Sequence, residues 1–318
     1  MKKILAGLLI LSCLFTGCNK KEDNKITLVL DYTPNTNHTG FYVAKELGYY
    51  KDAGLELEII QPPEDGALAL LAGKKTEFGV TYQEELITAI AAENPLPVTA
   101  VAALLVHNTG GIMSRKDKNI TRFKDLEGKS YGSWSIPIYD EIIFDCVKSD
   151  GGDPSKVEMI PNKAVDIITG LQREFDATWV YEGWDKVIGD INGLETDFLA
   201  FRDINPVFDY YTPIIAANDT YIKENRDTAE KFLEATKKGF EYAAKNPEES
   251  AKILVKQAPE IDEEIAIKSQ DYLKDKYFEG KWGEIDKTRW DNFTSWMNEK
   301  GLINTDKELV GFTNEYLK

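Results

Sequence analysis

Short apolar strands alternate with helices along this chain, and the alternation occurs in two successive sets. In the first set, strands are predicted at residues 26–30, 55–60, 77–81 and 98–106, and helices at 41–50, 66–72 and 84–92. The second set has predicted strands at 111–113, 130–132, 157–160 and 177–180, and helices at 139–148 and 164–173. Because strand–helix–strand units with short turns favour parallel neighbours, the pattern predicts an α/β fold with mostly parallel sheets.

After the second set the chain returns to the first domain. Residues 212–217 form a predicted strand that runs back, and residues 227–318 are mainly helical. We therefore assign residues 26–108 and 213–318 to lobe 1 and residues 109–212 to an inserted lobe 2. Two connections cross between these lobes. A cleft between two lobes is a usual place for a small-molecule site.

The N-terminus is typical of an exported protein. Two lysines precede an apolar stretch at residues 4–15, which is shorter than the roughly 20 residues that span a bilayer. The following sequence, Phe-Thr-Gly-Cys ending at Cys18, resembles a bacterial lipobox, although Leu is usual where Phe15 stands. This predicts a signal peptide at 1–17, lipidation of Cys18 with a tether at 18–25, and a protein held at the outer face of the cell membrane. Cys13 is the alternative lipidation site, and a plain cleaved signal is the alternative to both.

Charge and cysteine content exclude several classes of function. The net charge of −16 argues against binding to nucleic acid and against adhesion to an anionic bilayer. Beyond Cys18 only Cys146 remains, in an apolar helical pattern that predicts a buried thiol, and the chain has two histidines. Neither a metal-ligand cluster nor a GxxxxGK[ST], HExxH or GxSxG motif occurs. We expect no metal, no cofactor and no enzymatic activity.

Four segments resemble a known family. Residues 30–44 (LDYTPNTNHTGFYVA) form the most specific match, and residues 48–55, 125–129 and 175–177 agree with it. They resemble the thiamine-pyrimidine solute-binding and pyrimidine-synthase family. The resemblance implies the two-lobed periplasmic-binding-protein fold of type II, with two crossovers and a ligand cleft between the lobes. It also implies that the chain binds formylaminopyrimidine or hydroxymethylpyrimidine and delivers it to the permease of an ABC importer.

The resemblance leaves alternatives open. Related proteins bind riboflavin, nitrate or sulfonates, and thiamine itself is a further candidate. The family also contains an enzyme that makes the pyrimidine from pyridoxal phosphate and its own histidine, and His38 falls at that histidine. However, the enzyme's glycine-rich and cysteine-rich segments are replaced here at residues 132–137 and 209–213. A secreted chain would also lack ready access to pyridoxal phosphate.

The loop after the first strand contains the first candidate ligand-binding residues. A flat heteroaromatic ligand needs aromatic faces to stack on and fixed hydrogen-bonding groups in its plane. Asp31 and Tyr32 end the strand, and Asn35 and His38 follow. Asp31 could accept from a ring amine, and Asn35 and His38 could bond to the ring edge. Alternatively, Asn35 and His38 cap the following helix.

The remaining candidates follow other strands or lie at the crossovers. They are Tyr82 and Glu85 after the third strand, Thr109 at the first crossover, Trp134 in lobe 2, Tyr181, Glu182 and Trp184 after a lobe 2 strand, and Tyr211 before the return crossover. Glu85 also suits a helix N-terminus, and Trp134 also suits a core. Trp179 is better explained by core packing. Since the candidates are acidic and aromatic, they favour a neutral or cationic ring over an oxyanion. Ligand contacts from both lobes would favour the closed form, which a permease could recognise.

Overall fold

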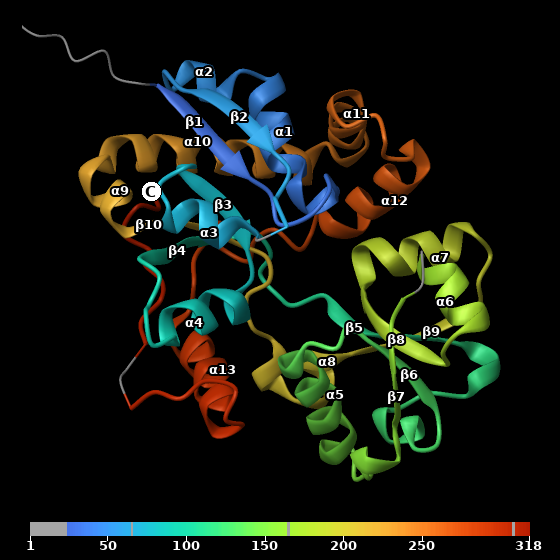
Figure 1. Cartoon of the computed structure of the whole chain (residues 1–318). Coiled ribbons are helices and arrows are strands. Elements are labelled where there is room, and N and C mark those ends of the chain that lie inside the picture. Colours follow the sequence, from blue (N-terminus) through green and yellow to red (C-terminus); the bar gives the residue numbers. More distant parts are fainter. Residues whose placement is uncertain (1–23, 65, 164–165, 307–308) are drawn as a thin grey trace, which may run out of the picture.

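A computed structural model describes residues 24–318 except 65, 164–165 and 307–308. The described residues form two five-stranded sheets in separate lobes (Figure 1). The lobe 1 sheet has the order β2 (Glu56–Ile60), β1 (Lys25–Val29), β3 (Phe78–Thr81), β10 (Ile214–Asn218), β4 (Val98–Ala103). The lobe 2 sheet has the order β7 (Glu158–Pro161), β6 (Ser130–Ser133), β8 (Ala177–Tyr181), β5 (Gly110–Arg115), β9 (Thr196–Ala200).

Each sheet is parallel except for one reversed strand. In lobe 1, β10 runs antiparallel to both β3 and β4. In lobe 2, β5 runs antiparallel to both β8 and β9. The two reversed strands are those that directly follow a crossover, so each enters its sheet from the other lobe. The predicted α/β fold with mostly parallel sheets is confirmed, but the sequence pattern did not indicate β9 or the internal position of β10.

Helices surround both sheets. In lobe 1 they are α1 (Thr39–Glu46), α2 (Tyr49–Asp52), α3 (Gly66–Ala72), α4 (Gln83–Ala91), α9 (Asp219–Glu224), α10 (Arg226–Lys245), α11 (Pro247–Gln257), α12 (Glu263–Leu273) and α13 (Lys287–Glu299). In lobe 2 they are α5 (Pro137–Ser149), α6 (Ile167–Arg173), α7 (Val187–Ile191) and α8 (Phe201–Ile204). The helix predicted at 41–50 is divided into α1 and α2, because Gly48 between them is left-handed, with φ of 80°.

The long helix α10 fixes the position of α1. Its buried residues recur at helical spacing, and Phe232 stacks on Phe78 of the sheet with 3.9 Å between ring centroids. Gly239 of α10 meets Gly40 of α1 so closely that a Cβ on Gly239 would lie 2.0 Å from the Gly40 carbonyl oxygen. Only glycine permits this approach. The same contact therefore holds in place the loop before α1, where the first candidate residues lie.

Helix α13 joins the two lobes. It lies beside α4 in Figure 1, yet its C-terminal end reaches α5 of lobe 2. Trp296 Nε1 donates to Asp145 Oδ2 at 2.9 Å, and Lys300 Nζ lies 2.9 Å from Asp145 Oδ1 and 2.8 Å from Glu141 Oε1. Cys146, on the same helix α5, is fully buried, as its apolar surroundings in the sequence predict.

The predicted membrane anchor falls outside the described residues. The signal peptide, Cys13, Cys18 and most of the tether precede residue 24, and β1 begins at Lys25, the last residue of the predicted tether. In the part of the chain that the structure describes, no helix is long and apolar enough to cross a membrane.

Candidate functional site

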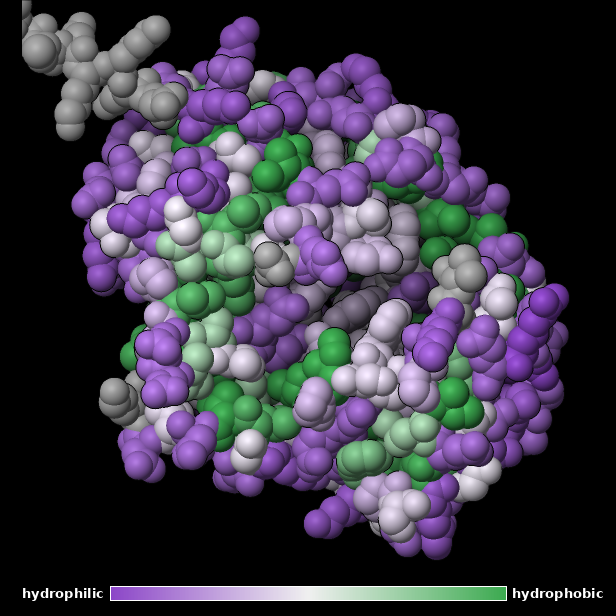
Figure 2. Space-filling view, in the orientation of Figure 1, coloured by the Kyte–Doolittle hydropathy of each residue, from purple (hydrophilic) through white to green (hydrophobic). Residues whose placement is uncertain are grey.

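The carboxyl ends of strands from both lobes face each other. Asp31 follows β1, Tyr82 follows β3, Trp134 follows β6 and Tyr181 ends β8. Figure 2 shows this face of the molecule hollowed between the lobes, with the deepest visible atoms coloured near the middle or the hydrophilic end of the scale. Strand ends at such a junction are a common location for ligand sites in α/β proteins.

Asp31 and His38 form a buried pair in lobe 1. His38 Nε2 lies 2.6 Å from Asp31 Oδ1, and the backbone N–H of Asn35 donates to His38 Nδ1 at 3.2 Å. Since Nδ1 accepts a hydrogen bond, Nε2 carries the proton and donates to Asp31. His38 is fully buried and both of its ring nitrogens are occupied. The structure therefore places His38 as the partner that orients Asp31, rather than as a group that meets a ligand directly.

Asn35 caps a helix, as the alternative interpretation of the sequence predicted. Its side chain accepts from the N–H of Asn37 at 3.0 Å at the start of a 3-10 helix (Thr36–His38). Asn35 is partly exposed, and its side-chain amide donates to the Thr33 carbonyl at 3.1 Å. Tyr32 of the same loop is 63% exposed, so its ring is available as a stacking face. This loop thus offers one free aromatic ring and one ionised acid.

Tyr82 and Glu85 extend the group around Asp31. Burial would raise the pKa of Asp31, but interactions with His38 and the Tyr82 hydroxyl outweigh it and hold the pKa below its ordinary value. Burial and the Asp31 charge raise the pKa of Tyr82, which remains a neutral donor. Glu85 is exposed, and its Oε2 accepts from Thr81 at 2.8 Å. Partial burial, together with the charge of Asp31, nevertheless raises the pKa of Glu85, and the hydrogen bond from Thr81 offsets this only in part.

Lobe 2 contributes a second acidic turn. Residues 182–186 form a π-helix directly after β8, where a simple turn was expected. Glu182 Oε2 accepts from the Tyr272 hydroxyl at 2.7 Å, while its backbone N–H donates to the carbonyl of Thr109 at 3.0 Å. Asp185 accepts from the N–H of Tyr181 at 2.9 Å, and burial raises the pKa of Asp185 to about 6. The side chains of Tyr181, Glu182 and Asp185 all remain partly accessible.

The two predicted tryptophans have different surroundings. Trp134 is 53% exposed and follows β6, so it presents a free aromatic face in lobe 2. Trp184 is partly buried and packs across the lobe boundary against a lobe 1 cluster that includes Tyr42, Leu254 and Ile261. Trp179 is buried, with its ring 4.1 Å from that of Phe201, in agreement with a core role.

Helix α12 takes part in the site although nothing in the sequence singled it out. Its Tyr272 bonds to Glu182, and its Ser269 donates to the Gly183 carbonyl. Ser269 also bonds to Thr36, which lies in the loop that follows β1. The helix thereby connects the first loop of lobe 1 with the π-helix of lobe 2. A periodic helix far along the chain gives no local signal of such a contact.

A further acid was also missed by the sequence analysis. Glu84 is 2% exposed and its Oε1 accepts from the hydroxyl of Tyr139 in lobe 2 at 3.1 Å. Its Oε2 is buried and has no hydrogen-bond partner among the described residues. Burial raises the pKa of Glu84 to about 8. Its position beside Glu85 at a helix start was the only sequence signal, and it equally suits an exposed N-terminal acid.

We use the name cleft acids for the carboxylates that follow the ends of β1, β3 and β8: Asp31, Glu84, Glu85, Glu182 and Asp185. Among the described residues, none of the five forms an ion pair with a lysine or arginine, and only Asp31 pairs with a histidine. The described residues contain no group of three or more His, Cys, Asp or Glu side chains placed to hold a metal ion. The site therefore suits a ligand that donates hydrogen bonds or carries positive charge, placed against aromatic rings.

Two predicted residues lie elsewhere. Thr109 is buried behind the π-helix, where its carbonyl accepts from Glu182. Tyr211 is buried at the crossovers, with its hydroxyl accepting from the N–H of Asp286 at 2.8 Å and the Arg289 guanidinium 4.0 Å from its ring centroid. The structure does not bring Tyr211 to the cleft acids, because the second crossover turns its ring toward α13.

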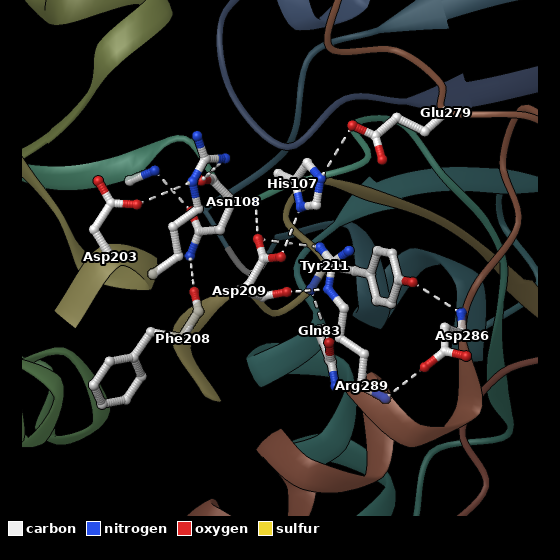
Figure 3. A network of polar contacts seen from close by, with 12 residues as sticks. Gln83, His107, Asn108, Asp203, Phe208, Asp209, Tyr211, Glu279, Asp286 and Arg289 are labelled. Atoms are coloured by element: carbon white, nitrogen blue, oxygen red, sulfur yellow. Dashed lines mark hydrogen bonds and ion pairs between the residues drawn. The ribbon is translucent and has the colours of Figure 1, made fainter. Parts of the chain in front are cut away.

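The surroundings of Tyr211 form a second polar group, the crossover cluster of His107, Asp209, Asp286 and Arg289 (Figure 3). Asp209 lies 2.7 Å from His107 Nδ1 and 3.4 Å from Arg289 Nη2, and it accepts from the N–H of Asn108 at 2.9 Å. These residues border an open cavity of about 560 Å³. Here, in contrast to the cleft acids, the central acid pairs with an arginine as well as a histidine.

Comparison with known proteins agrees with this architecture. The model of the family described as NMT1/THI5 like matches residues 35–250. The chain is 28% identical over 314 residues to the formylaminopyrimidine-binding protein of Halalkalibacterium halodurans, covering 93% of this chain and 91% of that protein. It is 26% identical over 312 residues to the 4-amino-5-hydroxymethyl-2-methylpyrimidine phosphate synthase THI5 of Saccharomyces cerevisiae, covering 92% of this chain and 88% of the synthase.

Solved structures share the fold. The Candida albicans CA3427 gene product, described as having the generic periplasmic binding protein structural fold, matches with a TM-score of 0.68 at 13% identity. The match covers 92% of this chain and 97% of that one. The expected periplasmic-binding-protein fold is therefore confirmed.

Proposed function

Because the chain belongs to the NMT1/THI5-like family, we propose that it is an extracytoplasmic solute-binding protein that delivers a thiamine pyrimidine precursor to an ABC importer. The ligand is formylaminopyrimidine or hydroxymethylpyrimidine, bound between the lobes. The protein is a lipoprotein anchored through Cys18, with lobe 1 at residues 26–108 and 213–318 and lobe 2 at 109–212. The relative named for formylaminopyrimidine binding supports the choice of ligand.

The charge of the cleft is the observation that carries the proposal. Asp31, Glu85 and Glu182 follow strand ends of the two lobes without a lysine or arginine partner among the described residues, whereas Glu84 is buried and its raised pKa favours the neutral acid. An aminopyrimidine presents an exocyclic amine that donates hydrogen bonds and a flat ring that stacks. In this proposal Glu182 and Asp31 accept from the amine, and the exposed rings of Tyr32 and Trp134, which belong to opposite lobes, stack on the pyrimidine. A sulfonate would meet the same acids as repulsive charges.

A binding role explains His38 better than a catalytic one. In a synthase that consumes its own histidine, the imidazole must be reached by the cofactor. His38 is fully buried, its Nδ1 accepts from Asn35 and its Nε2 donates to Asp31. An imidazole held in this way orients an acid and is shielded from attack. We therefore propose that the chain is not an enzyme, despite its similarity to THI5 synthases.

A titration of residues 24–318, which contain every described helix and strand, tests the proposal. The ligands are hydroxymethylpyrimidine, formylaminopyrimidine, thiamine, riboflavin and taurine. Calorimetry measures the binding of each. We expect micromolar or tighter binding of a pyrimidine. The Glu182→Ala variant should bind about 10- to 100-fold more weakly, as expected for a lost hydrogen bond to a charged group. The Glu56→Gln variant, which changes an exposed acid on β2, should bind as the parent does.

Each other outcome has a distinct meaning. Tight binding of taurine or riboflavin, with no pyrimidine binding, would keep the transport role and overturn the ligand. Formation of a pyrimidine product from pyridoxal phosphate, with loss of His38, would overturn the binding role itself.

A further inference from the structure

Glu84 is a buried acid at the boundary between the lobes. It belongs to α4 of lobe 1, and its only side-chain hydrogen-bond partner among the described residues is Tyr139 on α5 of lobe 2, at 3.1 Å. The side chain is 2% exposed, and Oε2 has no hydrogen-bond partner. Such a carboxyl is costly to ionise, because burial removes water and no cation replaces it.

Among the described residues, the groups that face Glu84 carry no positive charge. From its own helix it faces Glu85, from α5 Tyr139, from β8 Tyr181 and from the second crossover Tyr210. One is an acid, and the other three are tyrosines whose pKa burial raises. The backbone hydrogen bond of Glu84 lowers its pKa only in part. The surroundings therefore favour the neutral acid.

Glu84 belongs to lobe 1 and Tyr139 to lobe 2, so the hydrogen bond between them crosses the boundary of the lobes. Separating them would remove the hydroxyl of Tyr139 and expose the carboxyl to water, where it ionises at its ordinary pKa of 4.5. Opening thus releases a proton from Glu84 at neutral pH, and closing takes one up.

We propose that closure of the two lobes is coupled to the uptake of one proton by Glu84, so that a rise in pH opens the cleft. This inference rests on the proposed function, because closure is the step that retains the ligand. The coupling between closure and protonation does not itself require a ligand. The pH window follows from the two states: between the ordinary value of 4.5 and about 8, closure weakens as the pH rises. Linkage allows at most about a tenfold change in the closing equilibrium for each pH unit.

Small-angle X-ray scattering of residues 24–318 without ligand tests the coupling directly. We expect the radius of gyration to increase between pH 6 and pH 9 as the closed form is lost. The Glu84→Gln variant, which keeps the shape but cannot ionise, should stay closed throughout. The Glu56→Gln variant is the matched control and should follow the parent. An unchanged radius in the parent, or a Glu84→Gln curve identical to the parent's, overturns the proposal.

A second variant keeps the test decisive if Glu84→Gln fails to fold. Tyr139→Phe removes only the hydroxyl that bonds to Glu84, so it should be more open than the parent at every pH. Closure equal to the parent's at every pH would show that the contact does not hold the lobes, which overturns the proposal.

Titration with hydroxymethylpyrimidine at pH 6 and pH 8.5 separates this proposal from the proposed function. We expect at least about tenfold weaker binding at the higher pH, and little change in Glu84→Gln. If scattering shows the coupling but no pyrimidine binds, the ligand is wrong and the coupling stands. If pyrimidine binds with the same affinity at both pH values and scattering is flat, the coupling is wrong and the ligand stands.

Discussion

The cleft acids and the crossover cluster differ in how their charges are compensated. At the crossovers, Asp209 has His107 and Arg289 as partners, and the ring of Tyr211 lies beneath the guanidinium. Among the cleft acids, Glu84 and Asp185 have no lysine or arginine partner in the part of the chain that the structure describes, and burial raises the pKa of both. Paired acids fix a geometry, because losing a partner is costly. Unpaired acids are left able to respond to a ligand or to pH.

The largest effect should come from breaking the paired cluster. Replacing Asp209 with Asn leaves Arg289, whose side chain is 18% exposed, without its charged partner. We expect the free energy of unfolding to fall by about 2–3 kcal/mol, less than for a fully buried pair. Urea unfolding at pH 7 measures this.

Asp203 is the matched control for this substitution. It lies at the same crossover, but its side chain is 78% exposed. The Asp203→Asn variant should stay within about 0.5 kcal/mol of the parent. Equal, small effects of both substitutions would mean that the crossover pairs do not hold the fold.

Asp31, the cleft acid that pairs with a histidine, should behave between the two groups. His38 and Tyr82 hold the pKa of Asp31 in the folded protein below the ordinary 3.8. The ionised carboxylate therefore stabilises the fold fully above pH 3.8, and this stabilisation is lost as the pH falls through the pKa of the folded state. Asp31→Asn should cost about 1–2 kcal/mol at pH 7. This cost should disappear in acid, as measured by unfolding at pH 7 and below pH 3. A cost that is independent of pH would show that the charge of Asp31 does not stabilise the fold.

The smallest effect, of opposite sign, should come from Asp185. Its pKa is raised to about 6, so ionisation costs stability as the pH rises from 3.8 through 6. Asp185→Asn keeps an acceptor for the N–H of Tyr181 and avoids that cost. We expect similar stability at pH 4 and a gain of about 1 kcal/mol at pH 8. A variant less stable than the parent at pH 8 would contradict this prediction, because it would show that the charge of Asp185 is stabilised by partners, as that of Asp209 is.

Local patterns in the sequence predicted the elements of the fold but not all of their partners. The strand predicted at 212–217 is found at 214–218, since a short apolar run is a local property. Its position between β3 and β4 depends on pairing across more than a hundred residues, which no local pattern records. The strand β9 was missed because its residues are only partly buried on both faces, without the alternation of a half-exposed strand.

The candidate site was predicted in the same uneven way. Asp31, Tyr82 and Glu182 follow strands, and strand ends gather at one edge of a sheet, so their neighbourhood was predictable. The occupancy of both nitrogens of His38 was not, because it depends on the turn geometry of Asn35. Tyr139, Ser269 and Tyr272 come from helices whose facing surfaces are set by packing between lobes.

The reversed strand β10 also sets the order in which the two sheets can be completed as the chain is synthesised from its N-terminus. All five strands of the lobe 2 sheet lie within residues 110–200, so this sheet can form while the rest of the chain is still being synthesised. The lobe 1 sheet lacks β10, the strand between β3 and β4, until the chain has been synthesised as far as residue 218. Until then β3 and β4 have no strand that pairs with both of them. The inserted lobe is therefore the first that can mature, and the lobe that begins the chain is the last.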